Sequence, residues 1–435
     1  MTKYAVVGTG GRSAMYIDAI TTGFPDHAEL VALCDRNPGR AAYYQSQIKE
    51  KTGKEVVTYT DDQFATMIER EKPDRLVVTT GPDRTHAEYI IRAMEAGLDV
   101  VTEKPMTTSA ELCRKILHAR EKTGRELQVT FNYRYSPPRS QIRRMIADGE
   151  IGDVLSVDFS WHLDTRHGAD YFRRWHRHRD NSGSLLVHKS THHFDLVNWW
   201  IDDVPEEVFA HGTKRYYTPE HADALGLSGR GERCTGCPVA KKCPFFLDIG
   251  EAERLKALYR DNEGNDGYYR DRCVFGEEID IWDTMSVSVR YKKGALLSYM
   301  LHAYSPVEGY RIAFNGSKGR IEHFASENTY INGDGSVPGE LEKGKVGITH
   351  IPEFSRPRVI EPETGTGGHG GGDPVLLHDI FARSGDETDP LRRRANQVDG
   401  TYSILVGVAA GISIDESRPV SVSKLIGDAP LGTRW

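Results

Sequence analysis

Short apolar runs alternate with amphipathic stretches over the first 130 residues of the chain. The runs have the length of strands, and the stretches between them repeat apolar residues at helical spacing. The expected strands are Tyr4–Val7, Glu29–Cys34, Arg75–Thr79, Asp99–Thr102 and Leu127–Phe131. Helices are expected at Thr85–Ala96 and Ser109–Thr123. Strands and helices that alternate through such short connections predict an α/β fold with a doubly wound parallel sheet of the Rossmann type.

The pattern changes after the segment Tyr135-Ser136-Pro137-Pro138. Residues 154–161, 284–291 and 295–301 alternate apolar and polar positions, which is typical of strands with one buried face. Lys292-Lys293-Gly294 joins the last two of these strands as a hairpin. The second half of the chain is therefore expected to contain a mostly antiparallel sheet.

These patterns predict two domains. Residues 1–134 are expected to form the Rossmann domain, and residues 135–435 an α+β domain in which helical spacing returns over residues 392–411. Residues 212–280 interrupt the second domain with polar, glycine-containing sequence. We interpret this segment as an insertion.

Composition narrows the class of protein. Of the 435 residues, 38% are hydrophobic and 27% are charged, which indicates a globular chain rather than a disordered one. The net charge of −7 gives no support to a nucleic-acid partner. The longest apolar run, Ile404 to Ile414, is shorter than the ~18 residues of a membrane span, so no membrane partner is expected. Few cysteines and no apolar leader favour a cytoplasmic location.

A glycine-rich turn follows the first predicted strand and opens a helix. The turn contains Gly8, Gly10, Gly11, Arg12 and Ser13. The first glycine allows a tight turn, and the second lets backbone N–H groups approach a pyrophosphate at the helix N-terminus. Serine stands at the third position of the fingerprint, where glycine or alanine is usual. The turn predicts a nicotinamide dinucleotide site.

An acidic residue at the end of the second predicted strand sharpens this prediction. Asp35 lies at the spacing from the glycines expected for a carboxylate that accepts hydrogen bonds from the adenosine ribose. Its charge repels a 2′-phosphate, which favours NAD. The adjacent Arg36 leaves NADP as the alternative.

The fourth predicted strand ends at Glu103-Lys104-Pro105. The carboxyl ends of parallel strands face the ligand crevice in an open α/β sheet, so Lys104 is expected to point toward the chemistry. A surface lysine before a proline that starts a helix is the alternative.

Together these residues resemble the glucose–fructose oxidoreductase and inositol dehydrogenase family (Gfo/Idh/MocA). The resemblance depends on Gly8–Ser13, Gly81–His86, Glu103–Pro105 and Asn132–Tyr135. It covers residues 1 to about 200, and the later strands and C-terminal helix more loosely. It implies an oxidoreductase that binds NAD, acts on a carbohydrate and forms a homo-oligomer. The cofactor-binding residues that it implies are Gly8, Gly10, Gly11, Arg12, Ser13, Asp35, Arg36, Thr80, Pro82, His86, Glu103 and Lys104.

The resemblance also assigns catalytic residues. Lys104 would hydrogen-bond the hydroxyl that is oxidised, and His192 takes the family's histidine position. His188 stands where the family has an aspartate, four residues before His192 and thus on the same helical face. An imidazole cannot stabilise the imidazolium of His192 by charge as a carboxylate does. The sequence therefore does not decide whether this protein uses the family's usual proton relay or acts on its usual substrate class. With a third ligand, the two histidines could instead bind a metal.

Seven of the 17 histidines fall between residues 162 and 193, in a region also rich in arginine. We interpret this region as a substrate rim, with a solvated basic loop as the alternative. Gly367–Asp373 is interpreted as a loop that closes over substrate, with a linker as the alternative. The candidate substrate-binding residues are Arg134, Trp175, Lys189, His193 and His369. A buried polar contact is the alternative role for His193.

Four of the six cysteines lie in the insertion: Cys234, Cys237, Cys243 and Cys273. Four thiolates are the ligand set of a structural tetrahedral zinc. An iron–sulfur cluster uses the same ligands, so it stays an alternative beside a disulfide and reduced thiols without metal. In each case the expected role is to stabilise the insertion.

The primary hypothesis is an NAD-dependent oxidoreductase that acts on a secondary alcohol of a sugar, glycoside or polyol. The second is a redox-assisted glycosidase, in which transient oxidation at C3 permits elimination and the bound NADH then returns the hydride. A nucleotide-binding redox sensor is the third, and Lys104 together with His192 argues against it.

Overall fold

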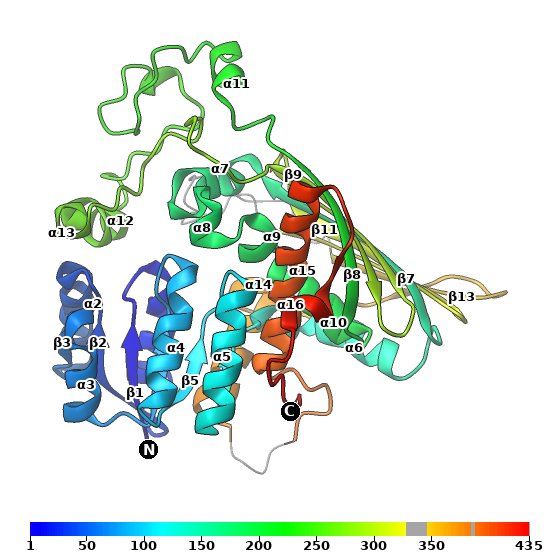
Figure 1. Cartoon of the computed structure of the whole chain (residues 1–435), viewed down its shortest axis with the longest axis horizontal. Helices are drawn as coiled ribbons and strands as arrows, with labels where there is room; N and C mark the ends of the chain where they lie inside the picture. The colour runs from blue at the N-terminus through cyan, green and yellow to red at the C-terminus, as the bar shows by residue number, and fades with distance from the viewer. Residues whose placement is uncertain (328–345, 384–387, 435) are drawn as a thin grey trace.

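A parallel sheet of six strands forms the N-terminal part of the molecule, in the order β3-β2-β1-β4-β5-β6 (Figure 1). The computed structural model describes residues 1–327, 346–383 and 388–434. The strands are β1 (Thr2–Val7), β2 (Ala28–Cys34), β3 (Val57–Tyr59), β4 (Arg75–Val78), β5 (Asp99–Thr102) and β6 (Leu127–Val129). The connecting helices are α1 (Ala14–Asp18), α2 (Pro38–Thr52), α3 (Phe64–Glu71), α4 (His86–Glu95) and α5 (Ala110–Thr123). This confirms the predicted Rossmann arrangement.

Local sequence explains where these helices begin and end. Asn37 caps α2 by accepting a hydrogen bond from the Gly39 N–H, and Ser109 caps α5 in the same way from Leu112. Both helices end at a glycine with left-handed backbone. The sequence pattern missed β3, because three residues at the sheet edge are too short to show a periodicity.

A second sheet of nine strands forms the other half of the molecule, in the order β14-β13-β12-β11-β7-β10-β9-β8-β15. Its strands are β7 (Val154–Asp164), β8 (Pro205–Thr213), β9 (Thr284–Tyr291), β10 (Leu296–Ser305), β11 (Glu308–Gly316), β12 (Gly319–Glu327), β13 (Val346–Pro352), β14 (Arg358–Ile360) and β15 (Val420–Ser421). The predicted hairpin is β9 and β10. The sheet is antiparallel except between β7 and β10, which run parallel. The predicted mostly antiparallel sheet is therefore confirmed.

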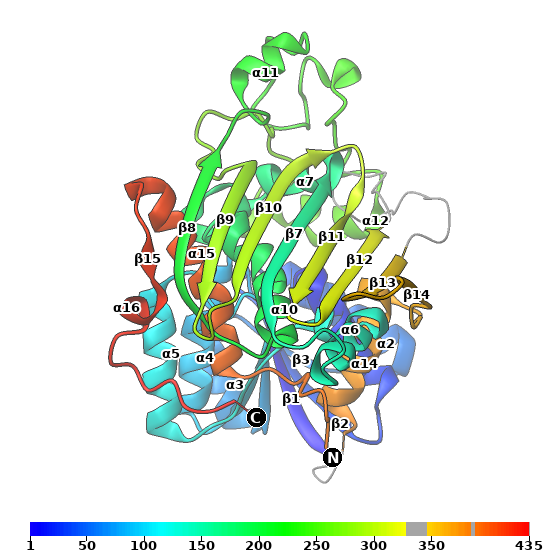
Figure 2. The same cartoon turned by 90° about the vertical axis from the view of Figure 1, so that its right-hand side faces the viewer.

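Helices fill the space between the two sheets. Figure 2 shows the strands of the second sheet side by side, with α10 (Ser190–Trp200) and α15 (Gln397–Glu416) behind them. Outside the insertion, the other α-helices described in this half are α6 (Pro137–Ala147), α7 (Thr165–Arg173), α8 (Arg179–Ser182), α9 (Leu185–His188), α14 (Gly368–Phe381) and α16 (Val422–Ile426). By length and composition α15 could cross a membrane, but 72% of its apolar window is buried inside the protein. It is therefore the central core helix of this half.

The insertion leaves the second sheet after β8 and returns at β9. It carries the short helices α11 (Pro219–Ala224), α12 (Glu253–Leu258) and α13 (Glu263–Asp266). The loop extends away from the sheet at α11 and then passes back over the first domain, where α12 packs against α2 (Figure 1). The domain boundary predicted at residue 134 falls in the short helix η5 (Asn132–Tyr135) between the two sheets and stays a prediction.

We expect the docking of α15 to depend on one of its glycines. A Cβ at Gly407 would lie 2.2 Å from the carbonyl oxygen of Leu186 in α9, whereas one at Gly411 would meet nothing closer than 3.8 Å. Gly407→Ala should therefore lower the free energy of unfolding by about 1–3 kcal/mol through overpacking. Gly411→Ala, in the same helix, should leave it unchanged or raise it by up to about 1 kcal/mol. Urea denaturation measures both, and equal effects would contradict this packing.

Candidate active site

A cavity of about 500 Å³ lies between the carboxyl ends of the first sheet's strands and the helices of the second half. Of the residues predicted to bind the cofactor, these line it: Gly8, Gly10, Gly11, Arg12, Asp35, Arg36, Thr80, Pro82, His86, Glu103 and Lys104. Ser13 does not line the cavity. Its hydroxyl donates to the Gly10 carbonyl at 2.7 Å, so it holds the shape of the turn.

The glycine turn has the backbone that a dinucleotide requires. Gly8 adopts a φ of +87°, and a Cβ there would lie 2.5 Å from the backbone of Thr80. Only glycine fits this position, so the turn can pass close beneath a pyrophosphate. A Cβ at Gly10 or Gly11 would meet only the hydroxyl of Tyr259, at 3.5 Å and 3.3 Å.

Asp35 is fixed at the end of β2 beside this turn. Its carboxylate accepts hydrogen bonds from the N–H groups of Thr9 (2.6 Å) and Asn37 (2.7 Å). The carboxylate also lines the cavity, where a ribose hydroxyl would donate to it. The turn and Asp35 thus fit a dinucleotide whose adenosine ribose lies over β2.

Lys104 follows β5 and enters the same cavity. Its Nζ donates to the carbonyl oxygen of His188 at 3.3 Å. Burial lowers the pKa of Lys104 to about 8, although the carboxylates of Glu103 and Asp83 act in the opposite direction. A lysine with this pKa is partly neutral near physiological pH and can accept a proton.

Glu103 connects the lysine to the glycine turn. Its buried carboxylate accepts hydrogen bonds from Arg12 Nε (2.6 Å) and the hydroxyl of Tyr16 (2.7 Å), and also from the N–H of Lys104 (3.2 Å). Burial acts to raise its pKa, but Arg12 and Lys104 outweigh burial and lower it. Glu103 is therefore an anion that positions Lys104.

His188 contacts a carboxylate that sequence reasoning did not assign to it. Its Nδ1 is hydrogen-bonded to Asp83, which comes from the loop after β4. Burial raises the pKa of Asp83 and lowers that of His188, so it disfavours charge on both groups. Asp83 thus gives a carboxyl partner to His188 and not to His192, the histidine whose partner the aspartate-to-histidine change removes.

His192 lines the cavity from α10. Its ring stacks on Tyr133 with centroids 4.1 Å apart. Burial lowers its pKa well below the ordinary value, and the charge of Lys104 adds to this effect. Its buried Nδ1 has no hydrogen-bond partner among the described residues. A neutral imidazole on the cavity wall is suited to exchange a hydrogen bond with a bound molecule.

The spacing of His188 and His192 predicted that both lie on one face of a single helix. In the structure they lie on two successive helices. The chain turns at Lys189, where α9 ends and α10 begins. Both rings still line the cavity, but His188 packs against His176 and His192 against Tyr133. In the described part of the chain no three histidine, cysteine or acidic side chains are arranged to hold a metal ion.

Three of the predicted substrate residues line the same cavity: Trp175, Lys189 and His369. Trp175 stacks on His176 at 3.6 Å between ring centroids, so one face of its indole is covered. His369 Nδ1 is hydrogen-bonded to Asp373 at 2.8 Å, which fixes the ring beside the cavity and lowers the pKa of Asp373 against the effect of burial.

Two predicted substrate residues lie in the core instead. Arg134 is 1% exposed and pairs with Asp195 at 2.5 Å and Asp399 at 3.1 Å. His193 is fully buried, is hydrogen-bonded to the hydroxyl of Tyr299 at 2.6 Å and stacks on Trp161. Neither lines the cavity, so the substrate roles of Arg134 and His193 are corrected to packing roles. The sequence suggested a substrate role for Arg134 and His193 because each is adjacent in sequence to a residue that does line the cavity, Tyr133 and His192.

Several residues that line the cavity carried no assigned role in the sequence. They are Arg40, Asp83, Tyr133, Tyr171, His176, Tyr259, Tyr268 and Glu327. Asp83 and Tyr133 lie within motifs that had been recognised. Tyr259 and Tyr268 come from the insertion, where no spacing or motif pointed to the dinucleotide site.

The four insertion cysteines lie together. All four line one small pocket, and none forms a disulfide. Zinc binding there stays a prediction.

Comparison with known proteins assigns the chain to a family. Residues 2–131 match "Oxidoreductase family, NAD-binding Rossmann fold", and residues 143–422 match "Oxidoreductase family, C-terminal alpha/beta domain". The chain therefore belongs to the Gfo/Idh/MocA family of oxidoreductases, which confirms the resemblance found in the sequence.

Individual relatives support the same assignment. The chain is 40% identical over 431 residues to "Putative oxidoreductase YteT" of Bacillus subtilis (strain 168), covering 95% of each. It is 30% identical to an inositol 2-dehydrogenase/D-chiro-inositol 3-dehydrogenase of Halalkalibacterium halodurans, over 64% of this chain and 76% of that protein. The fold matches the aldose-aldose oxidoreductase of Caulobacter crescentus with a TM-score of 0.61 at 17% identity, covering 97% and 99% of the two chains.

The core position of Arg134 predicts an effect on stability. Arg134→Met leaves two buried carboxylates without their cation and should lower the free energy of unfolding by about 3–5 kcal/mol. Arg144→Met, which removes an exposed ion pair to Glu363, is the matched control and should cost at most about 1 kcal/mol. Urea denaturation measures both. An unchanged stability in Arg134→Met would contradict the packing role.

Proposed function

We propose that the protein is an NAD-dependent dehydrogenase that oxidises a secondary alcohol of a sugar or polyol. The observation that carries the proposal is one cavity lined by the glycine turn, Asp35, Lys104 and His192. A dinucleotide site and a pair of proton-transfer groups that share one cavity are what alcohol oxidation requires.

The side chains divide the work as follows. A bound NAD supplies the hydride acceptor. Lys104 in its neutral form accepts the proton of the substrate hydroxyl, since burial brings its pKa to about 8. His192, which stacks on Tyr133 and lines the cavity, orients that hydroxyl with its imidazole ring. His188 and Glu103 position the lysine, because the lysine Nζ donates to the His188 carbonyl and the lysine N–H donates to the Glu103 carboxylate. The ring of His188 is in turn held by its hydrogen bond to Asp83.

The polar rim supports a polyhydroxylated substrate. Lys189, His369 and Glu327 supply donors and an acceptor at one end of the cavity, and Tyr133 adds an aromatic face. Such a mixture recognises hydroxyl groups on a ring rather than an apolar molecule. The name of the Halalkalibacterium relative, an inositol dehydrogenase, agrees with a cyclic polyol. A cytoplasmic location and a homo-oligomeric assembly stay predictions.

An assay with a substrate panel tests the proposal. Inositols, aldoses and aryl glycosides are each incubated with the purified protein and NAD, and NADH formation is followed by absorbance. Net NADH with at least one polyol or sugar is expected. Glycoside cleavage without net NADH would contradict the dehydrogenase and favour the redox-assisted glycosidase, which no contact among the described residues singles out. Bound nucleotide with neither activity would favour the redox sensor.

The substitution Lys104→Met tests whether Lys104 is the proton acceptor. The variant should lose about 10²–10⁴-fold in kcat and keep its affinity for NADH. Lys115→Met, an exposed lysine on α5, should retain full activity. In the unmodified enzyme, kcat/KM for oxidation should rise with pH and level off above about 8, because only the neutral amine accepts the proton. A flat profile would contradict Lys104 as the acceptor.

We also propose that the four insertion cysteines bind a structural zinc. Each sulfur accepts an N–H: Cys234 from Arg173 and Leu247, Cys237 from Gly231, Cys243 from Phe245 and Cys273 from Phe275. Arg173 is 1% exposed, and the nearby Asp170 is paired with Arg270 instead. The buried guanidinium favours a thiolate at Cys234, whereas burial raises the pKa of Cys243 and Cys273, so the ion itself must draw off their protons. The thiols must also rotate inward to reach one ion.

Metal analysis of the purified protein tests the zinc site. About one zinc per chain is expected, lost in Cys237→Ser and retained in Cys113→Ala, which alters a cysteine of α5 outside the cluster. Zinc below about a tenth of an equivalent would contradict the proposal. Iron with acid-labile sulfide in its place would contradict it in favour of an iron–sulfur cluster.

A further inference from the structure

The insertion forms part of the wall of the dinucleotide site. Its residues 253–268 lie over α2 and the glycine turn, and Tyr259 and Tyr268 line the cavity. The Gly11 N–H donates to the hydroxyl of Tyr259 at 2.9 Å, and Arg254 donates to the Gly11 carbonyl at 2.6 Å. The segment thus contacts the very turn that faces the pyrophosphate.

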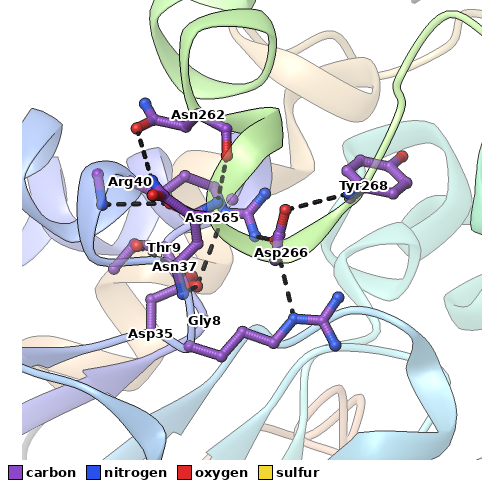
Figure 3. Close-up of polar contacts among 12 residues, drawn as sticks. Gly8, Thr9, Asp35, Asn37, Arg40, Asn262, Asn265, Asp266 and Tyr268 are labelled. Carbon is purple, nitrogen blue, oxygen red and sulfur yellow. Dashed lines mark hydrogen bonds and ion pairs between the residues drawn. The ribbon is translucent and has the colours of Figure 1, made fainter.

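A second set of contacts fixes the insertion at the ribose end of the site. Asn37, which caps α2, donates through its amide to the carbonyl of Asn262 at 2.9 Å and accepts from Asn265 at 3.2 Å. Figure 3 shows these residues beside Asp35, with Asp266 of the insertion next to Arg40 of the first domain. The adenosine end of the dinucleotide is therefore bordered by both segments.

The carboxylate of Asp266 lies close to both arginines that are next to Asp35, Arg36 and Arg40. It forms an ion pair with Arg40 and lies 3.8 Å from Nε of Arg36. The Asp266 side chain is only 5% exposed, so the pair with Arg40 is shielded from water. Burial acts to lower the pKa of Arg40, but Asp35 and Asp266 outweigh it and raise the pKa, which keeps this arginine charged.

This arrangement has a direct consequence for the 2′ position of the adenosine ribose. An enzyme that binds NADP neutralises the 2′-phosphate with a nearby arginine. Here Arg36 and Arg40 already face a carboxylate, and a phosphate would approach both Asp35 and Asp266. The insertion therefore places a second negative charge, Asp266, near the 2′ position, in addition to Asp35 at the end of β2.

We propose that the insertion completes the dinucleotide site and that Asp266 is the residue that discriminates against the 2′-phosphate of NADP. The proposal rests on the proposed nucleotide-dependent function. It makes Asp35 necessary for the choice of NAD but not sufficient. Without Asp266, Arg36 would lose its carboxylate and Arg40 would keep only the 3.6 Å contact with Asp35, so both could turn to a phosphate.

Equilibrium binding of NADH and NADPH, followed by their fluorescence, tests the role of Asp266 without relying on turnover. Asp266→Asn keeps the size of the side chain and its acceptor for the Tyr268 N–H while it removes the charge. The Kd for NADPH should fall at least about tenfold, and the Kd for NADH should change less than about threefold. Asp266→Ser serves as a second variant, and thermal unfolding shows which of the two is folded.

Two controls isolate the mechanism. Asp261→Asn removes the same charge from the same segment, but at an exposed residue paired with Lys256, and should leave both affinities unchanged. Arg36→Gln and Arg40→Gln added together to Asp266→Asn should abolish the gain in NADPH affinity, since they remove both freed cations. A gain that persists in this triple variant would overturn the proposal.

Other outcomes separate this proposal from the proposed function. If the folded Asp266 variants bind NADPH no better than the unmodified protein does, Asp266 does not discriminate and the proposal is overturned. If they lose affinity for NADH as strongly as for NADPH, Asp266 has only a structural role at the site, and the proposal is again overturned. If the unmodified protein binds neither nucleotide, the proposed function itself fails.

Discussion

The site depends on one buried carboxylate. Glu103 is 4% exposed. Its carboxylate accepts hydrogen bonds from the guanidinium of Arg12, the hydroxyl of Tyr16 and the backbone N–H of Lys104. Arg12 belongs to the glycine turn and Lys104 to the end of β5, so the carboxylate fixes the proton-transfer group relative to the dinucleotide turn. A buried anion is tolerated only when it is paired and hydrogen-bonded, which makes this geometry rigid.

Burial also sets the proton chemistry around this anchor. It disfavours charge on Lys104, His188 and His192 alike, and the positive charges in the cavity reinforce one another's effect. The histidines are therefore neutral, and the lysine is the group whose protonation changes near neutral pH. Asp83, from the loop after β4, completes the arrangement because it is hydrogen-bonded to His188.

The second half of the molecule serves the site in two ways. Its core helices hold the histidines through the buried pair of Arg134 with Asp195 and Asp399, which ties η5 to α10 and α15. Its insertion reaches back over the first domain, where contacts of Tyr259 and Asp266 border the dinucleotide turn. A segment that is remote in sequence from the glycine turn thereby becomes part of the nucleotide site.

The sequence by itself determined the class of fold, the glycine turn, Asp35 and Lys104. These depend on local spacing and on the rule that parallel strands present their carboxyl ends to one edge, and both are readable along the chain. Only the tertiary structure decided that Arg134 and His193 pack in the core, that Asp83 contacts His188, and that Asp266 contacts Arg40. Such contacts join residues 61 to 226 positions apart. Periodicity reports which face of an element is buried but not which distant side chain it meets, so the choice between a core contact and a site contact was settled by packing.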